Sequence, residues 1–166
     1  NVYLSPSSSA ERRAMLDELA SAMRDTDADA IVITGDFNLA PRAEDGLFGT
    51  QPSTFTKPAE RRAFEDLLRS ADLVDATRPS PGGILEFTFE RVQQGRRTRF
   101  RCDLALMSSH IFDRAVVMYD HTVRAMPDAF TDHSALIVDM QTAGMDRPGL
   151  DQVATGVRNG RTRYPS

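Results

Sequence analysis

The stretch AIVITGDFN, residues 30–38, joins a short apolar run of mostly β-branched residues to a polar turn. Such a run is typical of a strand buried on both faces, and we expect this strand to span residues 30–34. Asp36 and Asn38 are two positions apart, so both side chains project to one side while Phe37 turns toward the core. Ligands of open α/β sheets bind beyond the carboxyl ends of strands, so one ligand could meet both polar groups. Considered alone, a Gly-Asp pair more often marks an ordinary polar turn.

Two amphipathic helices are predicted, one before this strand and one after it. The first follows a strand at residues 2–4 and begins at a capping box formed by Ser8 and Glu11. The second begins after Pro58. Each helix carries one apolar stripe at helical spacing: Leu16, Leu19, Ala20 and Met23 in the first, and Phe64, Leu67, Leu68 and Ala71 in the second.

The second half of the chain changes to the period-two pattern of β-strands. Runs at 86–92 and 98–107 are joined by a turn and predict a hairpin, and two apolar strands follow at 115–119 and 134–140. The order of elements predicts an α/β fold with one mixed, mainly antiparallel sheet and both helices on one face.

The other face of such an apolar sheet needs a cover, because it would otherwise expose a large hydrophobic patch. We therefore expect a partner, either another chain or a preceding N-terminal half. The sequence also begins without a methionine, directly in a strand, so we expect it to be cut from something longer. Residues 1–142 suit one domain, and the polar, aperiodic stretch 143–166 is expected to be a flexible tail.

Charge and composition narrow the class of partner. The net charge of -4 argues against a protein that coats nucleic acid by bulk electrostatics. Arginines at 91, 96, 97, 99 and 101 nevertheless form a basic edge around the predicted hairpin. We take Arg96, Arg97 and Arg99 as candidate nucleic-acid contacts, and the alternative is a solvated strand surface.

Cys102 is the only cysteine, which excludes an internal disulfide and a zinc site built on several cysteines. A metal is therefore expected to use oxygen or imidazole ligands, and Cys102 is expected to be a core thiol facing away from Asp103. No apolar run reaches the roughly 18 residues of a membrane span, and no signal segment opens the chain. We expect no membrane contact and an intracellular location, the nucleus included.

Three further polar residues form a possible site with Asp36 and Asn38. Asp103 lies in an apolar strand end, where a lone carboxylate is costly unless it is paired or bound to metal. A salt bridge between Asp103 and Arg99 or Arg101 would also explain a carboxylate at this position. Asp132 and His133 precede the last strand, where an ordinary turn is the alternative.

Together these residues match the needs of phosphodiester hydrolysis. That reaction requires a divalent cation on oxygen ligands, a positioned water and a group that stabilises charge on the phosphoryl oxygens. A carboxylate such as Asp103, bonded to one ring nitrogen of His133, would fix its tautomer and leave the other nitrogen for a phosphate.

From residue 2 to residue 140 the sequence resembles the endonuclease/exonuclease/phosphatase superfamily, in particular its apurinic endonuclease and exonuclease branch with the endonuclease domains of retroelements. The resemblance rests on the tyrosine-bearing strand and turn at 2–7, GDFN at 35–38, LVDA at 73–76 with Arg78-Pro79, RCDL at 101–104 for the usual Arg-x-Asp, and TDH at 131–133 for the usual Ser-Asp-His. Thr88-Phe89 stands where the family often has Thr-Trp. The implied fold is the C-terminal half of a two-sheet, DNase I-like α/β sandwich.

The resemblance also implies roles for the candidate residues. Asp36 would orient or deprotonate the attacking water or act on the leaving oxygen, and Asn38 would hold the water and phosphate. His133, oriented by Asp103, would contact the scissile phosphate. The remaining two implied roles are a phosphate contact through the Tyr3 hydroxyl and a part for Asp132 in binding Mg²⁺ or Mn²⁺.

One departure from the family pattern limits the expected activity. The family's N-terminal half supplies an asparagine and a glutamate that is a principal metal ligand, and this sequence contains neither segment. We expect the chain alone to bind metal weakly and to turn over slowly or not at all. Divalent-metal-dependent hydrolysis of nucleic acid, DNA first, is the predicted function. The alternatives are a phosphatase or lipid phosphodiesterase of the same superfamily, and a catalytically inactive structural or interaction module.

Overall fold

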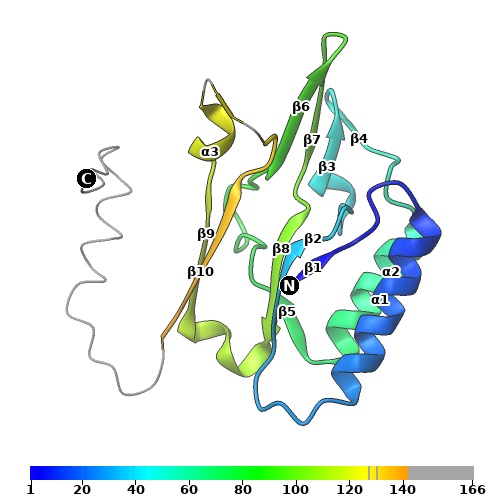
Figure 1. The fold of residues 1–166 in the computed structure, drawn as a ribbon, viewed down its shortest axis with the longest axis vertical. Helices are drawn as coiled ribbons and strands as arrows, with labels where there is room; N and C mark the ends of the chain where they lie inside the picture. Colours follow the sequence, from blue (N-terminus) through cyan, green and yellow to red (C-terminus); the bar gives the residue numbers. More distant parts are fainter. Residues whose placement is uncertain (127, 130, 142–166) are drawn as a thin grey trace.

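The structure is a computed structural model that describes residues 1–126, 128–129 and 131–141 (Figure 1). The predicted tail at 143–166 lies outside these residues. The described part contains two long helices, several short strands and two 3-10 turns. Its helices are too short or too polar to cross a bilayer.

The central sheet has the strand order β1-β2-β8-β5. These strands are β1 (Val2–Tyr3), β2 (Val32–Asp36), β8 (Asp103–Ser108) and β5 (Leu73–Asp75). β1 runs parallel to β2, whereas β8 pairs antiparallel with β2 and β5, so the predicted mixed sheet is confirmed. Gly35 is required in β2 because a Cβ there would collide with the carbonyl of Val2 in β1.

Both long helices pack on one face of this sheet, as predicted (Figure 1). α1 (Ser9–Arg24) and α2 (Pro58–Ser70) lie side by side. The apolar stripes meet the sheet in a core formed by Leu4, Leu16, Ala20, Ile33, Phe37, Leu39, Ala63, Phe64, Leu67, Leu73, Leu104 and Leu106. Burial of this surface is the main stabilising contribution to the fold.

The N-terminal ends of the two helices are joined by a buried ion pair. Arg12 Nε donates to Glu60 Oε1 over 2.5 Å, and both side chains are 1% exposed. Glu60 also accepts from Ser9 Oγ and from the amide of Lys57, each over 2.7 Å. Ser8 caps α1 by accepting from the amide of Glu11, whereas its own amide donates to Ser5. The N-terminal ends of the two helices are thus held together.

The strand predicted at 30–34 lies two residues later, at Val32–Asp36. Ile31 leaves the ladder because it exchanges hydrogen bonds with Ser108, its carbonyl accepting from the amide and its own amide donating to the hydroxyl. The strand is also not buried on both faces, since Val32 is 42% exposed. The shift has a functional consequence, because it makes Asp36 the last residue of a strand.

The stretch 98–107, predicted as one strand, is two strands in two different sheets. β7 (Arg96–Phe100) belongs to a sheet of order β4-β3-β7-β6, with β6 (Phe89–Gln93), β3 (Gly46–Phe48) and β4 (Gln51–Pro52). The chain bends between β7 and β8, where the amides of Cys102 and Asp103 both donate to Thr88 Oγ1. At the same bend the Arg101 side chain is fully buried against Asp45 and Asp75.

The last two strands form a separate antiparallel ribbon. β9 (Ala115–Asp120) follows the 3-10 turn η2 (Ser109–Arg114), and β10 (Ala135–Met140) pairs with it beyond the short helix α3 (Thr122–Ala125). The α/β class is confirmed, but the strands of the described residues form three sheets and not one, because the chain bends between β7 and β8 and the ribbon does not join the central ladder.

The ribbon lies against the face of β8 opposite the helices. Tyr119 donates its hydroxyl to the carbonyl of Asp103 over 2.7 Å. Leu136 and Val138 of β10, with Thr34 of β2, line a groove of about 290 Å³ between the ribbon and the central sheet. The second face of the sheet is therefore only partly covered by this chain.

Candidate active site

Asp36 and Asp103 are brought together by strand register. They are paired across β2 and β8, at the end of one strand and the start of its antiparallel neighbour. Paired residues of neighbouring strands project to the same face, so the two carboxylates share one side of the sheet. Tyr3 stands beside Asp36 in the register of β1, at the sheet edge, and its side chain is 64% exposed.

His133 reaches this point because its loop is hydrogen-bonded to the start of β6. The amide of Ser134 donates to the carbonyl of Thr88, and the amide of Glu90 donates to that of Asp132. His133 Nδ1 then lies 2.9 Å from Asp103 Oδ2. Its Nε2 is 4.0 Å from Asp36 Oδ2 and 4.0 Å from Asp132 Oδ1. Asp103 thus orients the imidazole, and the second ring nitrogen faces two more carboxylates.

The alternative partners of Asp103 are engaged elsewhere. Arg101 bonds to Asp45 and Asp75, and the Arg99 guanidinium stacks on Phe87 at 4.8 Å. The salt bridge considered as an alternative from the sequence therefore does not form in this structure.

The electrostatics of the cluster couple its members. The hydrogen bond to Asp103 is the largest effect on the pKa of His133 and raises it. Burial opposes this rise, and the charges of the nearby carboxylates add to it. Burial raises the pKa of Asp36, and the charge of Asp103 adds to it, against the lowering effect of the hydrogen bond from the Asn38 amide. The pKa values of His133 and Asp36 are therefore both raised, as is common for titratable groups at functional sites.

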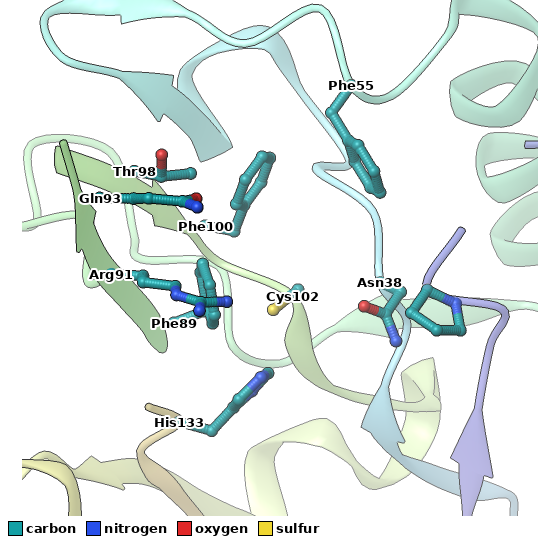
Figure 2. Close-up of a pocket in the computed structure, with 10 residues that line it drawn as sticks. Asn38, Phe55, Phe89, Arg91, Gln93, Thr98, Phe100, Cys102 and His133 are labelled. Carbon is teal, nitrogen blue, oxygen red and sulfur yellow. The ribbon is translucent and has the colours of Figure 1, made fainter. Parts of the chain in front are cut away.

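Asn38 is fixed by two hydrogen bonds just beyond the strand end. Its amide donates to Asp36 Oδ1 over 2.8 Å, and its side-chain nitrogen donates to the carbonyl of Leu4 over 3.0 Å. The residue adopts a left-handed backbone with φ of 47°, which asparagine tolerates better than most residues. Its side-chain oxygen lies on the pocket side (Figure 2).

A pocket of about 400 Å³ opens next to His133 (Figure 2). Its walls are largely aromatic, formed by Phe55, Phe89 and Phe100. The ring of Phe89 lies 5.2 Å from that of His133, and the ring of Phe100 lies 5.6 Å from that of Phe55. Other residues that line it are Pro6, Asn38, Arg91, Gln93, Thr98 and Cys102.

The hairpin arginines are divided between two faces. Pairing of Arg91 with Thr98 and of Gln93 with Arg96 puts these residues on the pocket face, whereas Arg97 and Arg99 belong to the opposite face. The Arg97 side chain also forms an ion pair with Glu90, with Nε 2.9 Å from Oε1. Of the three candidate arginines, only Arg96 shares the pocket face. Arg91 was left out of that set, although its two-residue offset from Phe89 could have identified it.

Cys102 was expected to face away from Asp103, and this expectation was wrong. Because the chain bends between β7 and β8, the strict alternation of side chains is interrupted. Cys102 is buried as predicted, yet its Sγ lies 3.7 Å from Asp103 Oδ2 and lines the pocket. Ligand atoms of Asp36, Cys102, Asp103 and His133 all lie within 4.8 Å of one another.

No protein-family model and no curated protein matches this chain significantly. Solved structures do match. An AP endonuclease from Archaeoglobus fulgidus superposes with a TM-score of 0.69 at 21% identity, over 86% of this chain and 60% of that one. The 3'-5' exonuclease NExo from Neisseria meningitidis superposes with a TM-score of 0.63 at 22% identity, over 80% of this chain and 53% of that one. The 3' phosphatase NExo from Neisseria, bound to product DNA hairpin, superposes with a TM-score of 0.62 at 21% identity, over 80% of this chain and 52% of that one.

These likenesses confirm the predicted resemblance at the level of the fold. The described residues have part of the DNase I-like fold that these AP endonuclease and NExo structures share. The chain spans only about half to three-fifths of the length of the structures that it matches.

Proposed function

We propose that this chain, whose fold is that of the endonuclease/exonuclease/phosphatase superfamily, carries catalytic residues for divalent-metal-dependent hydrolysis of phosphodiesters in nucleic acid, DNA first. The observation that carries the proposal is the cluster at the sheet edge. His133 Nδ1 is held by Asp103 at 2.9 Å while Nε2 faces Asp36 and Asp132 at 4.0 Å each. A donor and a proton acceptor then face the same small space beside a pocket.

The residues of the cluster divide the work of hydrolysis between them. The hydrogen bond to Asp103 raises the pKa of His133, and in its protonated form His133 donates from Nε2 to a non-bridging phosphate oxygen and stabilises the charge that develops there. Asp36 accepts a proton from the attacking water, and Asn38 holds that water or the phosphate through its side chain. Tyr3 is an exposed phosphate contact at the sheet edge.

The carboxylates suit a hard divalent cation. Asp132 is the most accessible of them, with its side chain 45% exposed, and Asp36 and Asp103 add negative charge close by. Mg²⁺ is commonly bound by one or two carboxylates, with water and substrate phosphate completing its shell. Asp132 would hold Mg²⁺ or Mn²⁺, which when bound would neutralise phosphate charge. One accessible carboxylate makes a weak site, so we expect millimolar metal to be needed.

The pocket suggests how a nucleic acid is held. Aromatic walls accept a base or sugar by stacking, a contact worth roughly 1–3 kcal/mol per base. Arg91 and Arg96 project from the same face of the hairpin, where they could follow the phosphate backbone past the pocket. The substrate phosphate would then lie between this face and His133.

We also propose that further polypeptide completes the site. The face of the central sheet opposite the helices is covered in part by β9 and β10, and the groove between β2 and β10 is lined by Thr34, Leu136 and Val138. Val32 remains 42% exposed on that sheet. A covering segment, from the same protein or a partner, would bury these side chains and bring additional metal ligands.

The test is single-turnover cleavage with protein in excess, at millimolar Mg²⁺ or Mn²⁺. Labelled DNA substrates would carry an internal abasic site, a plain 3' end or a 3' phosphate, and a phospholipid headgroup ester would test the lipid alternative. We expect slow cleavage of DNA that falls about 10²–10⁴-fold in Asp36→Asn and His133→Gln. His110→Gln, which changes an exposed histidine outside the site, is the matched control.

The substrate profile separates the alternatives. Release of phosphate only from the 3'-phosphate substrate would make the protein a phosphatase. Cleavage equal in the wild type and both site variants would overturn the proposal. No cleavage by any of them would agree with the expectation that the chain alone turns over slowly or not at all, and would favour an inactive interaction module only if a covering segment also fails to restore cleavage.

A further inference from the structure

The thiol of Cys102 adds a soft sulfur ligand to a cluster whose other donor atoms are oxygen and nitrogen. The residue is 4% exposed and sits at the bend between β7 and β8, in the wall of the pocket. Two carboxylates and an imidazole surround it, with ligand atoms of Asp36, Cys102, Asp103 and His133 all within 4.8 Å of each other. The group is thus a mixed sulfur, nitrogen and oxygen donor set rather than a lone thiol or a cluster of acids.

The spacing of these atoms is close to that of a four-coordinate metal site. With bonds of about 2.0 Å to oxygen and nitrogen and 2.3 Å to sulfur, tetrahedral ligand atoms lie roughly 3.3–3.7 Å apart. Here His133 Nε2 is 4.0 Å from Asp36 Oδ2, and one ligand atom each of Asp36, Cys102 and His133 lies within 4.8 Å of the others.

The hydrogen bond between Asp103 and His133 is of the kind that supports zinc-binding histidines. A histidine that binds zinc donates its other ring N–H to a carboxylate, which fixes the tautomer and raises the basicity of the ligand nitrogen. Asp103 holds Nδ1 at 2.9 Å and so leaves Nε2 directed toward Asp36. The imidazole is therefore oriented for a metal before one arrives.

We propose that Asp36, Cys102 and His133, with Asp103 behind the imidazole, form a site for Zn²⁺ or a similar thiophilic divalent ion. On binding, the sulfur–hydrogen bond of Cys102 and the Nε2–hydrogen bond of protonated His133 break, and both protons leave to solvent. A sulfur–metal bond and a nitrogen–metal bond form in their place. Mg²⁺ and Mn²⁺ prefer oxygen ligands, whereas thiolate selects zinc, and zinc also binds mixed sites more tightly than manganese does. The thiol is what separates this site from the proposed magnesium site at Asp132.

This zinc site engages the same groups that the proposed function uses for proton transfer. Zn²⁺ on Asp36 and His133 Nε2 removes the proton acceptor and the phosphate donor together. Zinc is therefore an inhibitor that competes with the reaction rather than a cofactor for it. The binding claim stands on Cys102 and its neighbours alone, and only the inhibition claim rests on the proposed function.

The decisive experiment measures metal binding without substrate. Zn²⁺ affinity of the purified chain is obtained by competition with a chromophoric chelator, and Co²⁺ is added separately as a spectroscopic probe. We expect one tight Zn²⁺ per chain and, with Co²⁺, a sulfur-to-metal charge-transfer absorption. Cys102→Ser should abolish this absorption and weaken Zn²⁺ at least about tenfold, and Asp103→Asn should weaken it by about 10–100-fold.

Controls keep the outcome unambiguous. His110→Gln should bind Zn²⁺ like the wild type, and circular dichroism should show that Cys102→Ser and Cys102→Ala remain folded. Zn²⁺ affinity unchanged in both cysteine variants, no sulfur-to-cobalt absorption, or no Zn²⁺ binding at all would each overturn the proposal. Failure to detect DNA cleavage would leave the binding result intact, so the two proposals fail separately. If DNA is cleaved, micromolar Zn²⁺ should suppress cleavage by the wild type more strongly than by Cys102→Ser.

Discussion

Replacement of Arg101 by methionine tests how the bend between the two sheets is held. The Arg101 side chain is fully buried and donates to Asp45 at 3.1 and 3.2 Å, to Asp75 at 2.7 and 3.1 Å, and to Thr77 Oγ1 at 2.7 Å. The side chain of Asp45 is 0% exposed and that of Asp75 is 10% exposed. Methionine fills similar space but leaves both carboxylates without this partner.

Removing one member of a buried ion pair typically costs about 3–5 kcal/mol, because the remaining charge is left uncompensated. Arg78 still contacts Asp45 in the variant, so we expect a loss near the lower end, about 3 kcal/mol. For a domain of this size that corresponds to a melting temperature lower by roughly 10 °C. The matched control is Arg97→Met. The Arg97 side chain is 57% exposed, so this change should lower the free energy of unfolding by at most about 1 kcal/mol.

Urea denaturation followed by circular dichroism measures both free energies of unfolding. Adding Asp75→Asn to Arg101→Met should recover part of the loss, by about 1 kcal/mol. A loss below about 1 kcal/mol in Arg101→Met, or no recovery when Asp75→Asn is added to it, would refute the reasoning.

Two further changes probe the helix junction and the site. Burial raises the pKa of Glu60, but hydrogen bonds from Arg12, Lys57 and Ser9 outweigh it, so the pKa is lowered. The ionised Glu60 therefore stabilises the fold fully above the ordinary carboxyl pKa. This stabilisation is lost as the pH falls through the lowered pKa. Urea titrations of Glu60→Gln should therefore show a protein less stable by about 1–3 kcal/mol at neutral pH, with a smaller loss of stability between pH 5 and 3 than the wild type. An NMR titration of the metal-free chain should give His133 a pKa above its ordinary value, and Asp103→Asn should lower that pKa because the hydrogen bond to Asp103 is the largest raising contribution. An unchanged His133 pKa in Asp103→Asn would count against the orientation described for the imidazole.

Much of the fold follows from local patterns in the sequence. The apolar stripes of both helices were readable because helical spacing repeats over several turns, and they meet the sheet as expected. The predicted residues Asp36, Asn38, Asp103 and His133 also lie together at one sheet edge. Each of them stands at the boundary of a strand, which is where a local pattern marks a change from buried to polar.

Other features depended on contacts between distant segments. One strand was predicted at 98–107 because its alternation of side chains continues. The chain nevertheless bends between β7 and β8, where it is held by Thr88, 14 positions from Cys102, and by Asp45, 56 positions from Arg101. That bend turns Cys102 toward the carboxylates and divides the strands between sheets. The division of Arg96 and Arg97 between two faces likewise became definite only with the hairpin register.

Sequence by itself therefore determined the helices, the class of fold and the residue types available for chemistry, because these depend on spacing within short segments. Only the tertiary structure decided which side chains share the site. Hydrogen bonds and ion pairs between residues dozens of positions apart, such as Arg101 with Asp45, override the two-residue period of a strand, and no local pattern records them.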